Sequence, residues 1–215
     1  MKKFIQNHNV YLTPLSPIHI GCGEDFEPTN YVIDSETLFN FEPSHLMLNE
    51  REKTDLLNAV NRLDLLAIQR FFLNHKDKAI ANSYYFADVA EGLAQDYKNQ
   101  VGKVSQRESD GNKVINKLSI ERTAFLPLQH LPYIPGSGFK GALATALLDQ
   151  AHQAKNNPKV SSKDHVHLLK EYIGEFEKSK LRHIKFGDFI PQSLAESKVY
   201  YSLNFKKKLG KTDGK

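Results

Sequence analysis

A glycine-rich junction at Pro132–Leu143 carries the residues best suited to bind an anion. Two prolines and two glycines there lead directly into the alanine and leucine run of a helix. Gly136 and Gly138 let a ligand approach the backbone with no Cβ in the way, and Ser137 is predicted to cap the helix. The first N–H groups of a helix lack intrahelical partners, and Lys140 adds a positive charge. The junction therefore predicts a phosphate site, with an ordinary strand-to-helix turn as the alternative.

A second segment, Ile18–Glu24, places two glycines directly after a short apolar stretch. Gly21 and Gly23 allow positive φ or the close approach of another chain. His19 is either a histidine satisfied in the core or in a loop, or a ligand contact. Cys22 is the chain's single cysteine, so neither an intrachain disulfide nor a cysteine zinc cluster is expected, and a reducing compartment is favoured.

The remaining histidines do not predict a metal site. His165 and His167 are two residues apart, so they face different sides of a helix. The sequence contains no His-x-x-x-His pair and no cluster of His and Glu residues of the kind that ligates zinc. Metal binding is therefore not expected.

The composition is that of a globular protein with a mild preference for anions. The 215 residues are 40% hydrophobic and 10% aromatic, which suits one good core or two small ones. The 29 Lys and Arg residues exceed the 25 Asp and Glu residues, giving a net charge of +4 and a pI near 8.9. No apolar run is long enough to span a membrane, and the N-terminus lacks a hydrophobic signal region. A soluble cytoplasmic protein is expected.

Both strands and helices must position these segments. The first part of the chain favours strands, at Asn9–Leu15 and then at Tyr31–Ile33 and Leu38–Phe41. The latter two are predicted to form a hairpin about the four-residue turn Asp34–Thr37. From Ser44 to Phe72 apolar residues recur at spacings near three and four, which predicts one or two amphipathic helices beginning close to Ser44.

The second half of the chain mixes both kinds of element. Gln95–Lys117 has few apolar anchors and is expected to be a flexible loop. The order of elements lacks a regular βαβα rhythm, which predicts an α+β fold. The remaining expected elements are a strand over Lys117–Phe125, a helix from the glycine junction through Leu148, a helix over His165–Phe176, and strands over His183–Ile190 and Val199–Phe205.

Two separated segments together resemble the RAMP superfamily of CRISPR effector proteins. They are Ser16–Gly23 and Tyr133–Ala142, in this order. Within that superfamily, Tyr31–Asp34 with its hairpin, the helical stretch that follows, and Arg182–Ile190 look most like the type III-A (Csm) subunit at the crRNA 3′ end, or its N-terminal half. The resemblance covers most of residues 10–205.

The resemblance implies a ferredoxin-like, RRM-like RAMP core within a domain of residues 1–205. A helical and flexible insertion would occupy residues 44–113, and a basic tail residues 206–215. The chain departs from the family where Ala144 and Thr145 replace a basic residue, and in being shorter than members of this subunit type. Either the second half of the subunit is a separate polypeptide, or this chain is a minimal form of the subunit. The RNA-binding residues implied are His19, Gly21, Gly23, Gly136, Ser137, Gly138, Phe139, Lys140 and Gly141.

Two further groups each have two interpretations. In the backbone subunits of related complexes an Ile-Asp pair cleaves target RNA with a divalent metal, and Val32–Asp34 resembles that pair. Asp34 instead suits the tight turn that follows it, where aspartate bonds to its own backbone. The tail lysines are either a solvated tail or further phosphate contacts; they are Lys206, Lys207 and Lys208.

The resemblance thus implies a non-catalytic, guide-RNA-binding subunit of a type III CRISPR interference complex. It would cap the filament near the crRNA 3′ end and influence how far that end is trimmed. Its partners would be crRNA, target RNA and neighbouring RAMP subunits, with the RNA recognised by backbone and shape. No cofactor is expected. The alternatives are a metal-dependent endoribonuclease that uses Asp34, and a protein-interaction module in which the glycine junction is structural.

Overall fold

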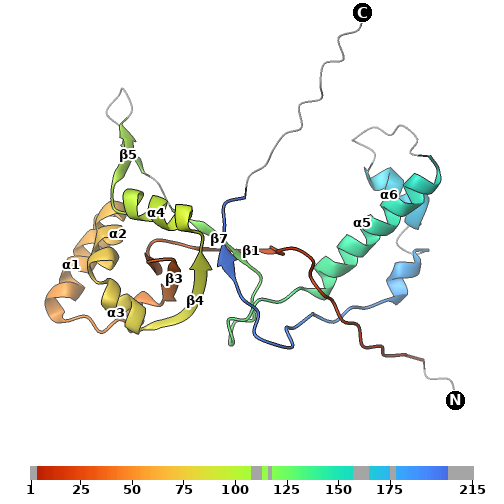
Figure 1. The fold of residues 1–215 in the computed structure, drawn as a ribbon, viewed down its shortest axis with the longest axis horizontal. Helices are drawn as coiled ribbons and strands as arrows, with labels where there is room; N and C mark the ends of the chain where they lie inside the picture. Colours follow the sequence, from red (N-terminus) through yellow and green to blue (C-terminus); the bar gives the residue numbers. More distant parts are fainter. Residues whose placement is uncertain (1–3, 108–112, 116–117, 157–164, 175–177, 203–215) are drawn as a thin grey trace, which may run out of the picture. The chain divides into compact units, whose positions relative to one another are not determined.

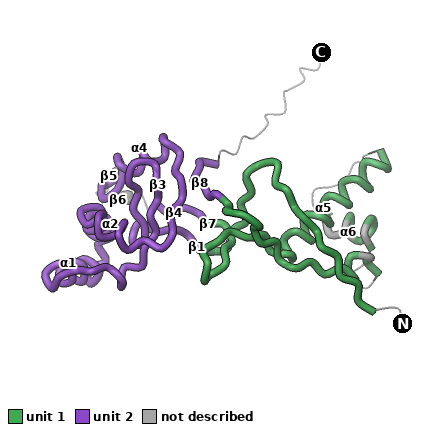
Figure 2. Tube along the Cα trace, turned by 60° about the horizontal axis from the view of Figure 1, so that its bottom comes forward, with its two compact units in different colours: residues 1–23, 122–195 green, residues 24–121, 196–215 purple. Residues whose placement is uncertain are grey.

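The computed structural model describes residues 4–107, 113–115, 118–156, 165–174 and 178–202 (Figure 1). It contains both helices and strands in an irregular order, which confirms the predicted α+β class. The chain forms two compact units, coloured separately in Figure 2. We call residues 24–121 with 196–215 the sheet unit, and residues 1–23 with 122–195 the motif unit, because both sequence motifs lie in the latter.

One four-stranded sheet forms the base of the sheet unit. In sheet order, its strands are β2 (Tyr31–Asp34), β3 (Thr37–Phe41), β4 (Ser83–Val89) and β8 (Lys198–Val199). The first three are antiparallel neighbours, and β8 is parallel to β4. The predicted hairpin is confirmed, but Asp34 pairs with Thr37, so the turn is only Ser35 and Glu36. Ser35 has a φ of 55°, as a two-residue hairpin turn requires.

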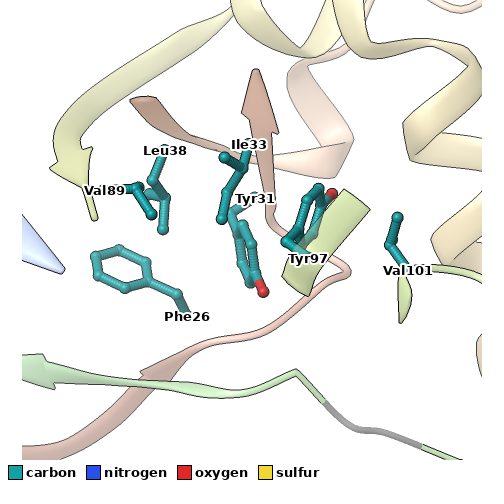
Figure 3. Packing of buried hydrophobic residues seen from close by; sticks show 7 residues of the cluster. All are labelled: Phe26, Tyr31, Ile33, Leu38, Val89, Tyr97 and Val101. Atoms are coloured by element: carbon teal, nitrogen blue, oxygen red, sulfur yellow. The ribbon is translucent and has the colours of Figure 1, made fainter. Parts of the chain in front are cut away.

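Apolar side chains fill both faces of this sheet, because successive residues of a strand point to opposite sides. One cluster packs against α4 (Glu91–Gln100) and is drawn in Figure 3. Its buried members are Phe26, Tyr31, Ile33, Leu38, Val89, Tyr97 and Val101. The opposite cluster consists of Val32, Phe41, Leu46, Phe71, Phe72 and Ala79. The strands are therefore fixed from both sides.

Three helices contribute to the second cluster, and the first two confirm the prediction of one or two helices over Ser44–Phe72. They are α1 (Glu50–Asn61), α2 (Leu65–Asn74) and α3 (Lys76–Ala81). The predicted start near Ser44 is only the short 3-10 helix η1 (Pro43–His45). The α-helix begins later because Asn49 and Glu52 form a capping box, in which each side chain accepts the backbone N–H of the other residue.

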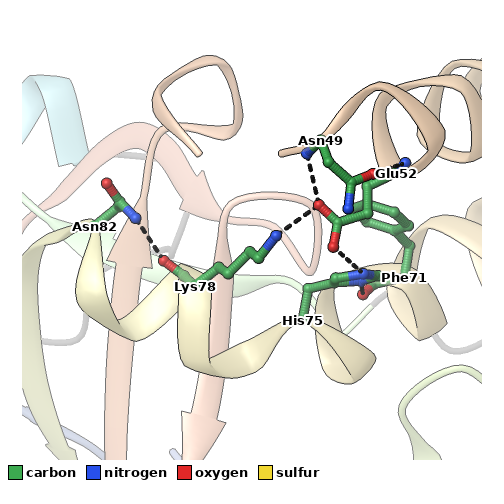
Figure 4. A network of polar contacts seen from close by, with 6 residues as sticks. All are labelled: Asn49, Glu52, Phe71, His75, Lys78 and Asn82. Carbon is green, nitrogen blue, oxygen red and sulfur yellow. Dashed lines mark hydrogen bonds and ion pairs between the residues drawn. The ribbon is translucent and has the colours of Figure 1, made fainter. Parts of the chain in front are cut away.

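Glu52 also joins α1 to the following helices (Figure 4). Its carboxylate accepts from Lys78 Nζ at 2.6 Å and from the Asn49 N–H at 2.8 Å. His75 Nε2 lies 3.4 Å from the other oxygen. The hydrogen bond from Lys78 is the main cause that lowers the pKa of Glu52, so the carboxylate stays charged and holds the helices together.

The prediction of a flexible loop over Gln95–Lys117 is wrong for the residues that the structure describes. That stretch contains the end of α4 and then β5 (Val104–Arg107) and β6 (Lys113–Ile115), which pair antiparallel. Side chains of α2 supply the contacts that the local sequence lacks. The buried Gln69 accepts the Gly102 N–H at 2.8 Å, and Arg70 donates to the Gly102 carbonyl at 2.7 Å.

The motif unit contains the two helices predicted for the second half of the chain. They are α5 (Gly136–Ala154) and α6 (His165–Ile173), followed by the 3-10 helix η2 (Lys180–His183). The expected end of α6 at Phe176 lies outside the described residues. His152 Nδ1 lies 3.1 Å from the Tyr172 hydroxyl, which holds α6 beside α5 (Figure 1). None of the helices in the described parts of the chain is long and apolar enough to cross a membrane.

The strand predicted over Lys117–Phe125 is confirmed as β7 (Ile120–Thr123), which pairs with β1 (Gly21–Phe26). Three other strand predictions differ from the structure. Asn9–Leu15 is not a strand, because its exposed residues pair with no strand in the described chain.

His183–Ile190 is also not a strand. Its first residue, His183, is the last residue of η2, and the rest of the stretch forms one isolated β-bridge, between Phe189 and Ile134. Of the strand expected over Val199–Phe205, only Val199 belongs to β8, and residues 203–205 lie outside the described part.

Candidate nucleic-acid interface

The glycine junction does start a helix, as predicted, but Ser137 is not its cap. Pro135 occupies the N-cap position and Gly136 is the first helical residue, which places Ser137 within the first turn. Gly138 and Gly141 are exposed, and a Cβ at either would meet nothing within 4 Å among the described residues. Both positions therefore present bare helix backbone, which another chain can approach closely.

Gly136 is glycine for a different reason. It is buried, and a Cβ there would lie 2.4 Å from the Phe186 carbonyl oxygen and 2.6 Å from that of Gly187. Its N–H donates to Asp188 Oδ1 at 2.9 Å. Asp188 thus caps α5 from a distant segment, and its negative charge is favourable at a helix N-terminus. Gly136 is therefore a packing residue, and the open backbone of the helix lies at later positions.

Phe139 and Lys140 also contact the segment that carries Asp188. The Phe139 ring packs against Phe186 at a centroid distance of 5.0 Å and against Phe189 at 4.7 Å. Lys140 Nζ donates to the Ile184 carbonyl at 2.9 Å. Phe139 is therefore part of the scaffold of the turn, whereas the Lys140 ammonium retains two further N–H donors.

A hydrogen-bonded ladder brings the two sequence motifs together. The Ala124 N–H donates to the Ile20 carbonyl at 2.7 Å, and the Tyr133 N–H donates to the Ala124 carbonyl at 3.1 Å. Ile134 continues the ladder through its bridge with Phe189. Ala124 is buried. The segment preceding Gly21 and the segment preceding Gly136 therefore lie on opposite sides of Ala124.

The loop of the first motif is open. His19 is exposed, with its Nε2 4.0 Å from where a Cβ on Gly21 would be. Gly23 has a φ of 77°, which confirms the expected positive φ. The Cys22 thiol donates to the Arg122 carbonyl at 3.3 Å. A core position for His19 is excluded, because its side chain faces solvent.

Arg122 lies beside this loop and was not singled out from the sequence. Its guanidinium carbon lies 3.4 Å from the centre of the Phe125 ring, which stacks with His130 on a centroid distance of 6.1 Å. Burial, followed by the nearby Arg122 charge, lowers the pKa of His130. The only sequence signal was an arginine in a strand next to the glycine junction, and stacking of this kind cannot be inferred from spacing.

Asp34 is held by a cation. It ends β2, and Lys76 Nζ donates to its Oδ1, which is the main cause that raises the pKa of the Lys76 ammonium. The described residues contain no group of three or more His, Cys, Asp or Glu side chains arranged to hold a metal ion. Lys206, Lys207 and Lys208 lie outside the described residues.

The structure thus joins the two motifs on one scaffold, and the comparison with known proteins identifies the family. The chain matches the RAMP superfamily over residues 11–213 and belongs to it. A curated relative is the CRISPR system Cms protein Csm5 of Methanocaldococcus jannaschii, which is 26% identical over 155 residues. The match covers 68% of this chain and 31% of the relative.

Two solved structures are also similar. One is the crystal structure of T. onnurineus Csm5, with 22% identity and a TM-score of 0.39 over 65% of this chain and 33% of that one. The other is the cryo-EM structure of a Csm–crRNA–target RNA ternary complex of a type III-A CRISPR-Cas system. It has 25% identity and a TM-score of 0.39, covering 65% of this chain and 31% of that one. The chain thus spans about a third of the length of the relatives it matches.

Proposed function

We propose that this chain is a non-catalytic, guide-RNA-binding subunit of a type III-A CRISPR complex. It caps the filament near the crRNA 3′ end and influences how far that end is trimmed. The observation that carries this proposal is the open backbone at Gly138 and Gly141, in the first two turns of α5, held on the same ladder as the first motif. Family membership and the likeness to Csm5 support it.

The chemistry of the turn suits an RNA backbone. No described residue accepts a hydrogen bond from the Ser137 or Gly138 N–H groups, and both residues are exposed at the positive end of the helix dipole. Such donors bind phosphate oxygens without reading bases, so recognition is independent of sequence. The partners are crRNA, target RNA and neighbouring RAMP subunits in the cytoplasm.

A matched pair of glycine variants tests this function. Gly138→Val puts a branched side chain where the RNA backbone would approach, and it is expected to lower affinity for a labelled single-stranded RNA by about tenfold or more, the equivalent of about one charge-assisted hydrogen bond. Gly92→Val is the control, because Gly92 is an exposed glycine in the first turn of α4 that also has open space. Equal RNA affinity of the two variants would refute the proposed site.

The absence of catalysis has a separate test in the assembled complex. Asp34→Ala removes the partner of Lys76 and is expected to leave every target-RNA cleavage product in place. Loss of one product, with assembly intact and with metal dependence of that product, would establish the endoribonuclease alternative instead.

A further inference from the structure

The segment that anchors the first turn of α5 is itself strongly basic. Residues 178–190 contain four Lys and Arg residues against one carboxylate, that of Asp188. The cations are Lys178, Lys180, Arg182 and Lys185. We call residues 178–185 the basic segment. The anchoring contacts described above come from the Ile184 carbonyl, the Phe186 ring and the Asp188 carboxylate.

The backbone of the basic segment is fixed by its own hydrogen bonds. The buried Ser179 side chain accepts the Leu181 N–H at 3.3 Å and caps η2, and the Ile184 N–H donates to the Leu181 carbonyl at 3.1 Å. Arg182, His183 and Lys185 nevertheless have exposed side chains. The charges are therefore presented from an ordered turn, which lowers the entropy cost of binding.

The other end of the basic segment is fixed to α5. Ile184 accepts from Lys140, Phe186 packs on Phe139, and Asp188 caps Gly136, as described above. Lys185 is adjacent in sequence to the Ile184 carbonyl that Lys140 contacts. The exposed Lys185 is therefore one residue away from the Ile184 contact with Lys140, and both lie in the motif unit.

We propose that Arg182 and Lys185, with His183 between them, form a second phosphate-binding surface that extends the glycine turn. Its ligand is the phosphate backbone of single-stranded RNA leaving the turn, bound through charge rather than through base edges. This inference rests on the proposed function, because the turn supplies the first phosphate contacts. Charged groups on a fixed segment would then set the direction in which the RNA leaves α5.

The test measures the salt dependence of binding to a fluorescein-labelled oligouridine. Arg182→Ala with Lys185→Ala is expected to reduce the slope of log affinity against log salt by about 1.4, from about 0.7 for each lost contact with a single strand. With equal affinities at about 1 M salt, the double variant then binds the RNA about 25-fold more weakly than the wild-type chain at about 0.1 M salt. The swap of Arg182→Lys with Lys185→Arg retains both charges and is expected to keep the wild-type slope.

The control is Lys98→Ala with Lys103→Ala, which removes two exposed lysines from the sheet unit. An equal loss in this control would overturn the inference, because charge anywhere on the chain would then suffice. Far-UV circular dichroism of each variant verifies that the fold is retained.

The remaining outcomes separate this inference from the proposed function. Absence of oligouridine binding by the wild-type chain would overturn both. Weakened binding by Gly138→Val together with unchanged binding by the double alanine variant would overturn the basic surface alone. Loss of polyglutamate binding by the double variant, with its RNA affinity unchanged, would assign the surface to an acidic protein partner instead.

Discussion

Gly136 and Gly138 are two residues apart in one helical turn, yet alanine is expected to have opposite effects at the two positions. At Gly136 a Cβ would lie 2.4 Å from the Phe186 carbonyl oxygen, whereas ordinary contacts begin at 3.4 Å. The segment around Phe186 must therefore retreat by about 1 Å, which lengthens the 2.9 Å hydrogen bond to Asp188 beyond the usual limit. At Gly138 the Cβ enters open space.

The magnitudes follow from these contacts. Loss of a hydrogen bond to a charged group costs about 1.5–3 kcal/mol, and a better helix residue offsets about 0.5–1 kcal/mol of it. Gly136→Ala is thus expected to destabilise the motif unit by about 1–2 kcal/mol. Gly138→Ala keeps every contact and is expected to stabilise the unit by up to about 1 kcal/mol.

Urea unfolding followed by circular dichroism, together with amide hydrogen exchange along α5, measures both effects. Exchange is informative because it reports the motif unit separately from the sheet unit. Unchanged protection of the Gly136 amide in Gly136→Ala would show that Asp188 does not cap the helix. A loss of stability in Gly138→Ala as large as that in Gly136→Ala would show that the first turn is not open.

Three further substitutions test the sheet unit. Gly102→Ala is expected to cost about 1–2 kcal/mol, because Gly102 has a φ of 68° and a Cβ would lie 2.5 Å from the Arg70 side chain. Tyr31→Phe leaves the Leu118 carbonyl without the 2.6 Å hydrogen bond it accepts from Tyr31 and is expected to cost about 1–3 kcal/mol by urea unfolding. Burial raises the pKa of Tyr97 from its ordinary 10.0 to about 12, so stability falls as pH rises through this window, and Tyr97→Phe should show a smaller alkaline loss.

The elements that the sequence predicts well are those with local signals. Alternating apolar residues about a short polar turn located the β2–β3 hairpin, and the proline–glycine junction located the start of α5. Both depend on residues close together in the chain. Alternation alone fails at Asn9–Leu15, because a strand also needs a neighbour to take up its backbone hydrogen bonds.

The residues that sequence reasoning missed act over long separations. Asp188 caps a helix 52 residues earlier, and the Ile184 carbonyl meets Lys140 across 44 residues. Neither contact leaves a periodic pattern in the sequence. The side chains of Gln69 and Arg70 likewise order Gly102 from another helix, which explains why a stretch with few apolar anchors forms a helix and paired strands.

The side chains most visible in the glycine motif are therefore largely engaged in contacts within the protein. Phe139 packs against aromatic rings, and a neighbouring backbone occupies the space beside Gly136. Lys140 donates one hydrogen bond to a backbone carbonyl. What remains open is backbone at Gly138, with further cations on the basic segment that contacts the same helix. Because backbone donors and charges bind phosphates without selecting bases, a surface of this kind suits a guide RNA whose sequence changes while its backbone does not.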